Sequence, residues 1–462
     1  MQNIKYTPEE PICAIATALA PSALGIIRCS GKSSISLVSK IFSRPKALLS
    51  APGNTLVYGW IIFEGKKIDE VMLSVYREPK SFTGEQMVEI SCHGGINVVT
   101  SILNILLKIG FRQAERGEFT FRAFINGKTD LTKAEAIREI IESHTSESRN
   151  RACGRLSGSL FNQINQIKQK IIDTIAQIEV EIEYPEDEEN FAESFDTTNL
   201  KNVKKELTDL QNSWKSEKLY QDGSRIVLCG KTNAGKSSLF NAILKEDRAI
   251  VSDIEGTTRD WIESWVDFAG LPCRIFDTAG LRETEDIIEA KGVESSKNLS
   301  EDADLVLYVI DSVSNLQKED LEFLKKLKKP FIIIWNKADL SENTKNFTDF
   351  QKDFPLFKGE VHLSAKKSTG LSELYLKIKN ALTQDTNTDR EQAGLGSARQ
   401  KQAVDEALES VSHALFIAEQ DYALDAVVQD LEDSLDNLKE ITGEVVADDI
   451  LSSIFANFCV GK

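Results

Sequence analysis

Residues Gly230 to Ser237 combine amino-acid types and a spacing that suit the binding of phosphate groups. They follow the pattern G-x-x-x-x-G-K-S and come directly after the apolar run Ile226–Leu228. Glycines let a backbone curl so that several N–H groups point into one concavity, a lysine adds a positive charge, and a serine hydroxyl can bind Mg²⁺. The apolar run before the pattern and the helical spacing after it disfavour a chance match in an ordinary turn. The sequence therefore predicts a strand, a phosphate loop and a helix.

Two polar segments follow later apolar runs, where the carboxyl ends of buried strands are expected. Asp277, in FDTAG, stands where a Walker-B-type carboxylate would assist Mg²⁺ binding, although this segment alone also fits an ordinary strand-end turn. WNKAD places Asn336, Lys337 and Asp339 after another run. A carboxylate there accepts two hydrogen bonds from guanine N–H groups, whereas adenine would leave it unpaired. These residues predict a site for a guanine nucleotide.

Two further segments complete the set. Gly256–Asp260 (GTTRD) lies between the phosphate loop and Asp277, where Thr258 would join Ser237 on Mg²⁺, and Leu363–Lys366 (LSAK) would cover the base. In chain order the five elements are the phosphate loop, GTTRD, FDTAG, WNKAD and LSAK. This order resembles the G domain of GTPases. The expected GTP-binding residues are Asn233, Ala234, Gly235, Lys236, Ser237, Ser238, Ser252, Asp253, Ile254, Glu255, Gly256, Thr257, Thr258, Asp277, Thr278, Ala279, Gly280, Asn336, Lys337, Asp339, Ser364, Ala365 and Lys366.

One residue departs from the pattern of Ras-like enzymes. They carry a glutamine directly after the D-x-x-G motif, and its amide orients the attacking water. Here Leu281 stands at that place, and an apolar side chain cannot orient a water molecule. We therefore expect hydrolysis to depend on another residue, another ion or another protein.

Composition bounds the class of protein. The chain has 462 residues, of which 41% are hydrophobic and 27% charged, so two or three globular domains are expected. No apolar run is long enough to cross a bilayer, and the first residues do not read as a signal peptide. The seven scattered cysteines contain no C-x-x-C pair, which fits a reducing cytoplasm and argues against a zinc site. A net charge of −17 excludes a uniformly basic nucleic-acid binder, so any RNA contact needs a local basic patch or a second protein.

Apolar periodicity predicts a multidomain fold. Residues 1–122 mix short apolar runs with Gly and Pro turns and one helical stretch, as in an α+β domain. Apolar residues three and four apart from Leu160 to Ile182 predict one long helix that ends before Pro185. Residues 123–220 and 385–462 read as two parts of an all-α domain, and the buried strands of 221–384 as an inserted α/β P-loop domain. Residues 383–400 read as the linker on the return path.

The flanking motifs narrow the family. FTGEQMVEISCHGG, GEFTFRAFINGKTDLTKAEAI and FCVGK resemble the MnmE (TrmE) family of tRNA modification GTPases, which belongs to the TrmE-Era-EngA-YihA-Septin-like GTPases. The resemblance covers essentially the whole chain. It implies an N-terminal domain that dimerises and binds a tetrahydrofolate, at Arg28, Glu89, Lys128 and Lys462. Taken alone, each of these residues would be read as an ordinary surface charge.

The resemblance also implies an activity. With an FAD-dependent partner, MnmG (GidA), in a heterotetramer, the family adds an aminomethyl or carboxymethylaminomethyl group to carbon 5 of the tRNA wobble uridine. The one-carbon donor is 5-formyl- or 5,10-methylene-tetrahydrofolate. A cytoplasmic protein without a membrane span is expected. The family binds K⁺ where other GTPases receive an arginine finger, here through Asn233, Ser252, Ile254 and Thr257, and its catalytic glutamate matches Glu289. Two positions, Phe121 and Ser252, depart from residues common in the family.

Other classes of function remain open at this point. A regulatory GTP switch that works by binding partners, for example in ribosome assembly, would share the whole G domain. A nucleotide-binding scaffold without turnover would share it too. The folate motifs and Lys462 favour the enzyme, whereas Cys459 receives no role because packing explains it equally well.

Overall fold

The structure is a computed structural model that describes residues 10–183, 197–245, 249–250, 262–277, 302–314, 316–340, 354–383, 394–420 and 424–462. The chain divides into two compact units. The first comprises Met1–Arg138, Phe161–Phe195 and His413–Lys462, and the second comprises Glu139–Leu160 and Asp196–Ser412.

A six-stranded sheet forms the core of the first unit. Its order is β3-β4-β5-β2-β1-β6, and all neighbours are antiparallel except β1 and β6. In β4 the alternate residues Val71, Leu73 and Val75 are buried, so one face of the strand packs against the core. The strands are β1 (Ile12–Ile15), β2 (Ser22–Ser30), β3 (Thr55–Phe63), β4 (Lys66–Tyr76), β5 (Met87–Gly94) and β6 (Arg112–Gln113).

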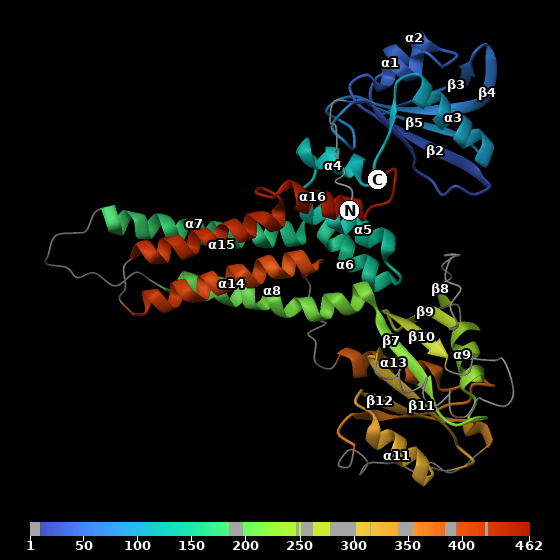
Figure 1. Ribbon diagram of the computed structural model, residues 1–462, viewed down its shortest axis with the longest axis vertical. Coiled ribbons are helices and arrows are strands. Elements are labelled where there is room, and N and C mark those ends of the chain that lie inside the picture. Colours follow the sequence, from blue (N-terminus) through green and yellow to red (C-terminus); the bar gives the residue numbers. More distant parts are fainter. Residues whose placement is uncertain are drawn as a thin grey trace. The chain divides into compact units, whose positions relative to one another are not determined.

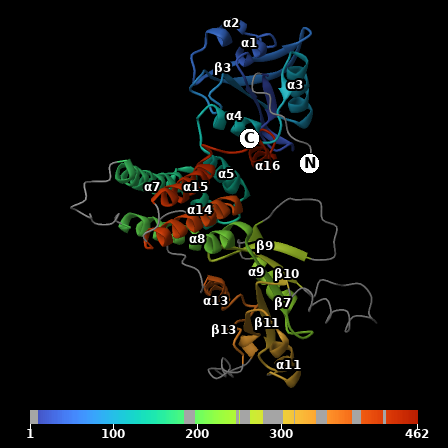
Figure 2. The ribbon, with the colours of Figure 1, turned by 60° about the vertical axis from the view of Figure 1, so that its left-hand side comes forward.

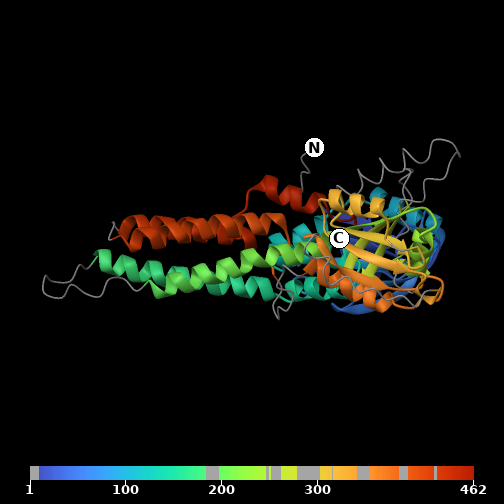
Figure 3. The ribbon, with the colours of Figure 1, turned by 90° about the horizontal axis from the view of Figure 1, so that it is seen from below.

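Helices complete this unit. The third, α3, buries Val99, Ile102 and Leu106 and packs on the sheet (Figure 1), because their spacing puts them on one side of the helix. In the views of Figures 1 and 3, α7 and α15 lie side by side. The helices are α1 (Ser34–Ser39), α2 (Pro45–Ser50), α3 (Ile96–Lys108), α4 (Glu118–Ile125), α5 (Leu131–Glu142), α7 (Ser159–Glu183), α15 (Leu424–Thr442) and α16 (Asp448–Ala456); α5 and α7 extend into the second unit.

A seven-stranded sheet forms the core of the second unit. Its order is β13-β12-β11-β7-β10-β9-β8; the first five strands are parallel, and β9 and β8 continue it antiparallel. Figure 2 shows β9 and β10 beside each other at one side of this sheet. The strands are β7 (Ser224–Cys229), β8 (Ala249–Ile250), β9 (Ile262–Phe268), β10 (Leu271–Asp277), β11 (Leu305–Asp311), β12 (Phe331–Asn336) and β13 (Phe357–His362).

The helices of the second unit pack on this sheet or precede and follow it. α8 leads into β7 through Gly223, and in the views of Figures 1 and 3 it lies beside α14. Gly223 has φ +69°, and a Cβ atom there would lie 2.5 Å from the Trp265 ring, so glycine is required. The helices are α6 (Ser146–Leu156), α8 (Thr198–Asp222), α9 (Lys236–Lys245), α11 (Lys318–Lys326), the 3₁₀ turn η2 (Ala338–Leu340), α13 (Leu371–Thr383) and α14 (Ala398–Ala418), whose last residues belong to the first unit.

The return segment directly before α14, Gly394–Gly396, is held by hydrogen bonds. The sequence predicted a linker over residues 383–400, but Gly394, Leu395 and Gly396 are buried. The Leu395 N–H donates to Ser213 Oγ at 3.2 Å, and Gln221 Nε2 donates to the Gly396 carbonyl at 2.8 Å. The prediction of a linker is wrong for these residues, because an apolar leucine and two close-packed glycines allow the segment to be buried against α8.

Four charged residues hold this return segment. Arg155 Nη1 donates to Glu217 Oε2 at 2.8 Å and to the Gly394 carbonyl at 3.2 Å, while Arg155 Nε donates to Glu139 Oε2 at 2.8 Å. Arg151 Nη1 reaches the other oxygen of Glu217 at 2.7 Å. We call Glu139, Arg151, Arg155 and Glu217 the neck charge cluster.

The predicted fold class is confirmed. The runs around ALGIIRC, TLVYGWIIF, VMLSVY and MVEISCHGG are β2 to β5, and the four apolar runs of the inserted domain are the parallel strands β7, β10, β11 and β12. The sequence reading missed β1, β6, β8 and the antiparallel β9. The boundaries expected for the individual domains stay predictions. Among the described residues, no helix combines the length and the apolar character that a membrane span requires.

Candidate functional site

The phosphate loop joins β7 to α9 in the conformation that its glycines predict. Gly230 and Gly235 have φ values of +140° and +92°, and Asn233 between them has φ +64°. A Cβ atom at Gly230 would lie 2.2 Å from the Val309 carbonyl, and one at Gly235 would lie 2.2 Å from Asn336 Nδ2. Because neither position leaves room for a side chain, both glycines are required for the backbone of this loop to curl as a phosphate-binding loop does.

Lys236 lies over this loop at the start of α9. Its Nζ donates to the carbonyl groups of Gly230 at 2.7 Å and of Lys231 at 2.9 Å. The next residue, Ser237, is exposed. A positive charge, a hydroxyl and a helix N-terminus therefore occupy adjacent positions, which is the set of groups that a nucleotide phosphate and its Mg²⁺ require.

Asn336 ties the phosphate loop to the segments expected to read the base. Its side chain is buried, and Nδ2 donates to the Ala234 carbonyl at 3.0 Å. Its Oδ1 accepts from the N–H groups of Ala365 at 3.1 Å and of Lys337 at 2.8 Å. Both polar atoms of this side chain are thus bonded to protein groups, so Asn336 connects three loops.

Lys337 makes a second link to the same loop. Its Nζ donates to Asp311 Oδ2 at 2.6 Å and to the Asn233 carbonyl at 3.0 Å. Burial raises the pKa of Asp311, but the hydrogen bond from Lys337, the hydrogen bond from the Val313 N–H and the charge of Lys337 together outweigh it, so the pKa is lowered overall. Asp311 therefore stays charged and holds the lysine against the phosphate loop.

Asp339 is presented as an anion at the edge of a cleft of about 520 Å³. The hydroxyl of Ser364 donates to its carboxylate and lowers the pKa, and Lys367 lies 3.4 Å away. Its carboxylate is thus ready to accept hydrogen bonds from the N–H groups of a guanine base. The cleft is lined by Gly235, Ser238, Asn241, Ala242, Lys245, Asn336, Lys337, Asp339, Leu340, Ser364, Ala365, Lys366 and Ser368.

The structure thus brings together the predicted residues of the phosphate loop and of the base-reading segments. For Asp277 it describes the backbone, which ends β10 beside Leu228 of β7 and so lies next to the start of the loop. The remaining predicted nucleotide and metal residues lie outside the described residues: Ser252, Asp253, Ile254, Glu255, Gly256, Thr257, Thr258, Thr278, Ala279, Gly280 and Glu289. Of the expected K⁺ ligands, only Asn233 is described.

Two of the expected folate residues contact each other in the first unit. Arg28 Nε lies 2.9 Å from Glu89 Oε1, and the pair is partly buried, with side-chain exposures of 17% and 20%. Arg28 Nη1 also donates to the Gly461 carbonyl at 3.2 Å, and its guanidinium lies over the rings of Phe82 and Phe119. These contacts hold a cation and an anion side by side at one place in the unit.

The two lysines are placed by different contacts. The carbonyl group of Lys462 accepts from the Phe119 N–H at 3.2 Å, which puts it next to the ring that lies under Arg28. Lys128 Nζ donates to the Pro79 carbonyl at 3.1 Å, and its side chain lies against Gly84. A carboxylate-bearing ligand fits such a set of basic groups, and the Glu89 carboxylate fits a ring that carries N–H groups.

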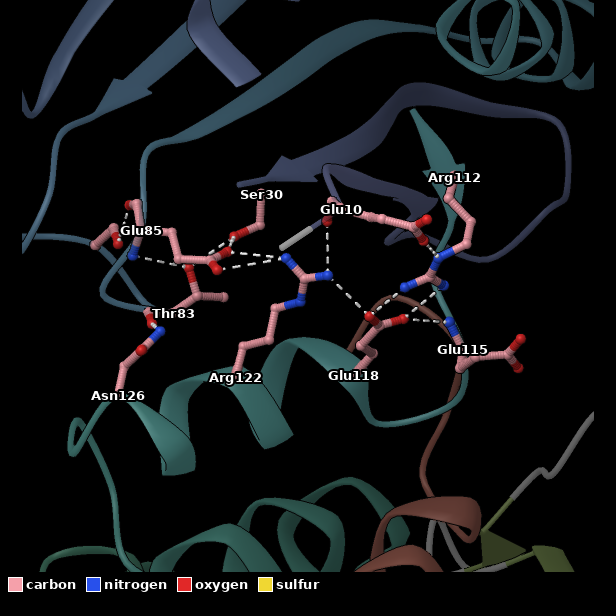
Figure 4. Close-up of polar contacts among 10 residues, drawn as sticks. Glu10, Ser30, Thr83, Glu85, Arg112, Glu115, Glu118, Arg122 and Asn126 are labelled. Atoms are coloured by element: carbon pink, nitrogen blue, oxygen red, sulfur yellow. Dashed lines mark hydrogen bonds and ion pairs between the residues drawn. The ribbon is translucent and has the colours of Figure 1, made fainter. Parts of the chain in front are cut away.

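Sequence reasoning missed the residues that support this site. Arg122, buried within α4, donates to Glu118 Oε1 at 2.9 Å and contacts Glu85 Oε2 at 3.2 Å (Figure 4). Arg112 contacts Glu118 at 2.6 Å, and Ser30 Oγ donates to Glu85 at 2.7 Å. We call Glu85, Arg112, Glu118 and Arg122 the N-terminal charge cluster. Charged residues four apart within the apolar run GEFTFRAF were the signal in the sequence.

Two family models match the chain. The model described as MnmE helical domain matches residues 131–459, and the one described as GTP-binding protein TrmE N-terminus matches residues 11–128. The tRNA modification GTPase MnmE of Treponema denticola is 50% identical over 476 residues, covering 100% of both chains. The protein of that name from Borrelia turicatae is 41% identical over 467 residues, again covering 100% of both.

Solved structures match part of the chain. The crystal structure of a substituted Era from Aquifex aeolicus bound to GDP·AlF₄⁻ covers 40% of this chain and 66% of its own, with 26% sequence identity and a TM-score of 0.28.

Proposed function

Because this chain belongs to the MnmE family of tRNA modification GTPases, it hydrolyses GTP with Mg²⁺ in tRNA modification, and we propose how it does so. It is a potassium-dependent GTPase that works with the FAD-dependent protein MnmG. Together they add an aminomethyl or carboxymethylaminomethyl group to carbon 5 of the wobble uridine. The proposal includes 5-formyl- or 5,10-methylene-tetrahydrofolate as the one-carbon donor, a homodimer through the N-terminal domain, a heterotetramer with MnmG, and a cytoplasmic location.

The observation that carries the nucleotide part is the buried Asn336 side chain, which joins the phosphate loop to the base-reading segments. In this proposal Lys236 binds phosphate oxygens, Ser237 binds Mg²⁺, and Asp339 reads guanine. When bound, Mg²⁺ and K⁺ offset the negative charge that spreads over the phosphate oxygens in the transition state. Because Leu281 cannot orient water, we propose that Glu289 does so.

The paired charges Arg28 and Glu89 support the folate part of the proposal. A ligand that carries both a glutamate tail and a ring with N–H groups matches them in sign. Lys462 and Lys128 supply further positive charge in the same unit. The overall charge of −17 supports a partner that contributes basic surface for tRNA, since the chain alone is strongly acidic.

The potassium proposal is tested by steady-state GTP hydrolysis in KCl and in NaCl at equal ionic strength. We expect turnover in KCl to be at least tenfold faster. Equal rates in the two salts contradict a K⁺ site. The variant Glu289→Ala should lower kcat while the dissociation constant for GTP stays within about twofold, because a water-orienting group acts mainly in the transition state. Glu285→Ala, in the same segment, is the matched control.

The base-reading role is tested with Asp339→Asn. The amide removes one acceptor and offers a donor, so the variant should lose its preference for GTP over xanthosine triphosphate. An unchanged preference contradicts the assignment. Asp436→Asn, on the exposed surface of α15, is the control.

The folate proposal is tested by calorimetric titration of the full chain with 5-formyl-tetrahydrofolate. Saturable binding that Arg28→Ala abolishes and Lys32→Ala, at an exposed position, leaves intact supports it. If the wild-type protein hydrolyses GTP but does not bind the folate, a regulatory GTP switch becomes the better account. Modification of tRNA with and without purified MnmG then tests the partner.

A further inference from the structure

Lys231, the residue after Gly230 in the phosphate loop, is held by a helix outside the loop. Its Nζ donates to Gln317 Oε1 at 2.6 Å and lies 2.9 Å from Glu319 Oε2 and 3.5 Å from Asp320 Oδ2. All three acceptors stand at the start of α11. The hydrogen bond to Glu319 raises the pKa of the Lys231 ammonium, so it stays protonated and paired.

The start of α11 is itself fixed. Asp320 is buried, and its carboxylate accepts from the Tyr308 hydroxyl at 2.8 Å and from the Gln317 N–H at 2.9 Å. Gln317 in turn accepts from the backbone of Asp320, which completes a capping box. Lys231 is therefore bonded to a helix end that Asp320 attaches to Tyr308 of β11.

The backbone of Lys231 contacts the residue that binds phosphate. Its carbonyl group accepts from Lys236 Nζ at 2.9 Å and from the Ala234 N–H at 3.3 Å. One residue thus connects α11, through its side chain, to both Lys236 and the turn of the loop, through its backbone.

We infer that Lys231 is a positioning residue for GTP hydrolysis, because its attachment to α11 keeps the phosphate loop curled before nucleotide binds. This inference rests on nucleotide binding at the loop, as in the proposed function. A loop that is already ordered loses less conformational freedom on binding. An ordered loop favours bound GTP and the transition state equally. Loss of the Lys231 side chain should therefore raise KM without lowering kcat.

The first experiment uses Lys231→Met in the full chain. We expect the dissociation constant for N-methylanthraniloyl-GDP and the KM for GTP each to rise by about three- to tenfold, the range of a partly exposed charge-assisted contact. The kcat should stay within about twofold, and Lys231→Arg should restore binding. Lys326→Met, at the exposed far end of α11, is the control. Unchanged affinity in Lys231→Met, or a fall in kcat alone, overturns the inference.

The second experiment uses Glu319→Gln to determine whether loss of a Lys231 partner weakens or tightens nucleotide binding. If Lys231 acted as a cation for phosphate, removal of a competing carboxylate would tighten nucleotide binding. The inference predicts the opposite, weaker binding by about two- to threefold, and no further weakening when Glu319→Gln is added to Lys231→Met. Tighter binding contradicts it. A wild-type protein that does not bind the nucleotide contradicts the proposed function instead, so the two failures are distinguishable.

Discussion

The two compact units each enclose a buried arginine between two glutamates. The side chains of Arg122 in the first unit and Arg155 in the second are 2% and 1% exposed. In both units the glutamate that is least exposed also contacts a second arginine, so each cluster contains two positive and two negative charges. The corresponding members are Arg122 and Arg155, Glu118 and Glu217, Arg112 and Arg151, and Glu85 and Glu139.

The clusters differ in how far they are closed to solvent. The N-terminal charge cluster reaches water through Arg112, 30% exposed, which pairs with Glu10, 56% exposed. In the neck charge cluster the second arginine, Arg151, is 11% exposed and lies 4.0 Å from the Tyr220 ring centre. A charge left without its partner is more destabilising where water cannot reach it. Removal of one charge should therefore lower the free energy of unfolding more in the neck charge cluster than in the N-terminal charge cluster.

The largest effect is expected for Arg155→Met in the neck. This substitution leaves Glu139 without the contact to Arg155 and the buried Glu217 with Arg151 alone. We expect the free energy of unfolding of the second unit to fall by about 3–5 kcal/mol, as for other buried pairs that lose one partner. Urea unfolding monitored by circular dichroism measures it. Arg149→Met, at an exposed position of the same helix, is the control, and an equal loss in both variants contradicts the comparison.

A smaller loss is expected for Arg122→Met in the first unit. Glu118 keeps its contact with Arg112, and Glu85 is 14% exposed, so we expect about 2–3 kcal/mol. The variant should also affect the proposed activities of the two units differently. Binding of 5-formyl-tetrahydrofolate should weaken, since Glu85 lies in the loop next to Arg28, whereas GTP hydrolysis should stay within twofold of wild type. A loss larger than that of Arg155→Met reverses the ranking.

Gly396→Ala tests how tightly the neck charge cluster is packed. A Cβ atom at this position would lie 2.3 Å from Glu139 Oε1 and 2.9 Å from Arg155 Nε. The charged groups would have to separate, and we expect a loss of about 1–3 kcal/mol in unfolding free energy. Gly95→Ala in the first unit, where the nearest side-chain atom is 3.7 Å away, is the control. If Gly396→Ala leaves the unfolding free energy nearly unchanged, the side chains of the neck charge cluster can move apart at little cost, and the cluster is not tightly packed.

The smallest effect is expected for Glu10→Ala. Its ion pair with Arg112 is solvent-exposed, so its removal should change the unfolding free energy by less than about 1 kcal/mol, and added salt should reduce the difference. Thermal unfolding at low and high salt measures it. A loss comparable to that of Arg122→Met would show that the N-terminal charge cluster is closed after all.

The sequence predicted those parts of the molecule that local spacing encodes. The glycines at 230 and 235 indicated the phosphate loop, and the three- and four-residue repeat from Leu160 indicated α7. Asn336 and Asp339 were expected at the site because each follows a buried strand. Their placement needs only the rule that parallel strands end at one edge of a sheet.

The charge clusters could not be predicted in full in this way, because some of their members are far apart along the chain. Arg155 contacts Gly394 across 239 residues, and Arg122 contacts Glu85 across 37. A charge in a sequence is usually a solvated surface residue, and only the fold shows which ones are buried together. The same reason explains the wrong linker at Gly394–Gly396. The assignments of Thr258, Glu289 and the other residues outside the described ranges stay predictions.

The hydrogen bond from Arg28 to the Gly461 carbonyl spans 433 positions and has a consequence for biosynthesis. A ribosome makes the strands around Arg28 early, and protein domains generally begin to fold as they emerge. The partner for this guanidinium is added only after the whole second unit has been translated. A nascent chain can therefore carry a folded six-stranded sheet while the Arg28 guanidinium still lacks its contact with the Gly461 carbonyl. That contact can therefore form only after translation has passed the second unit.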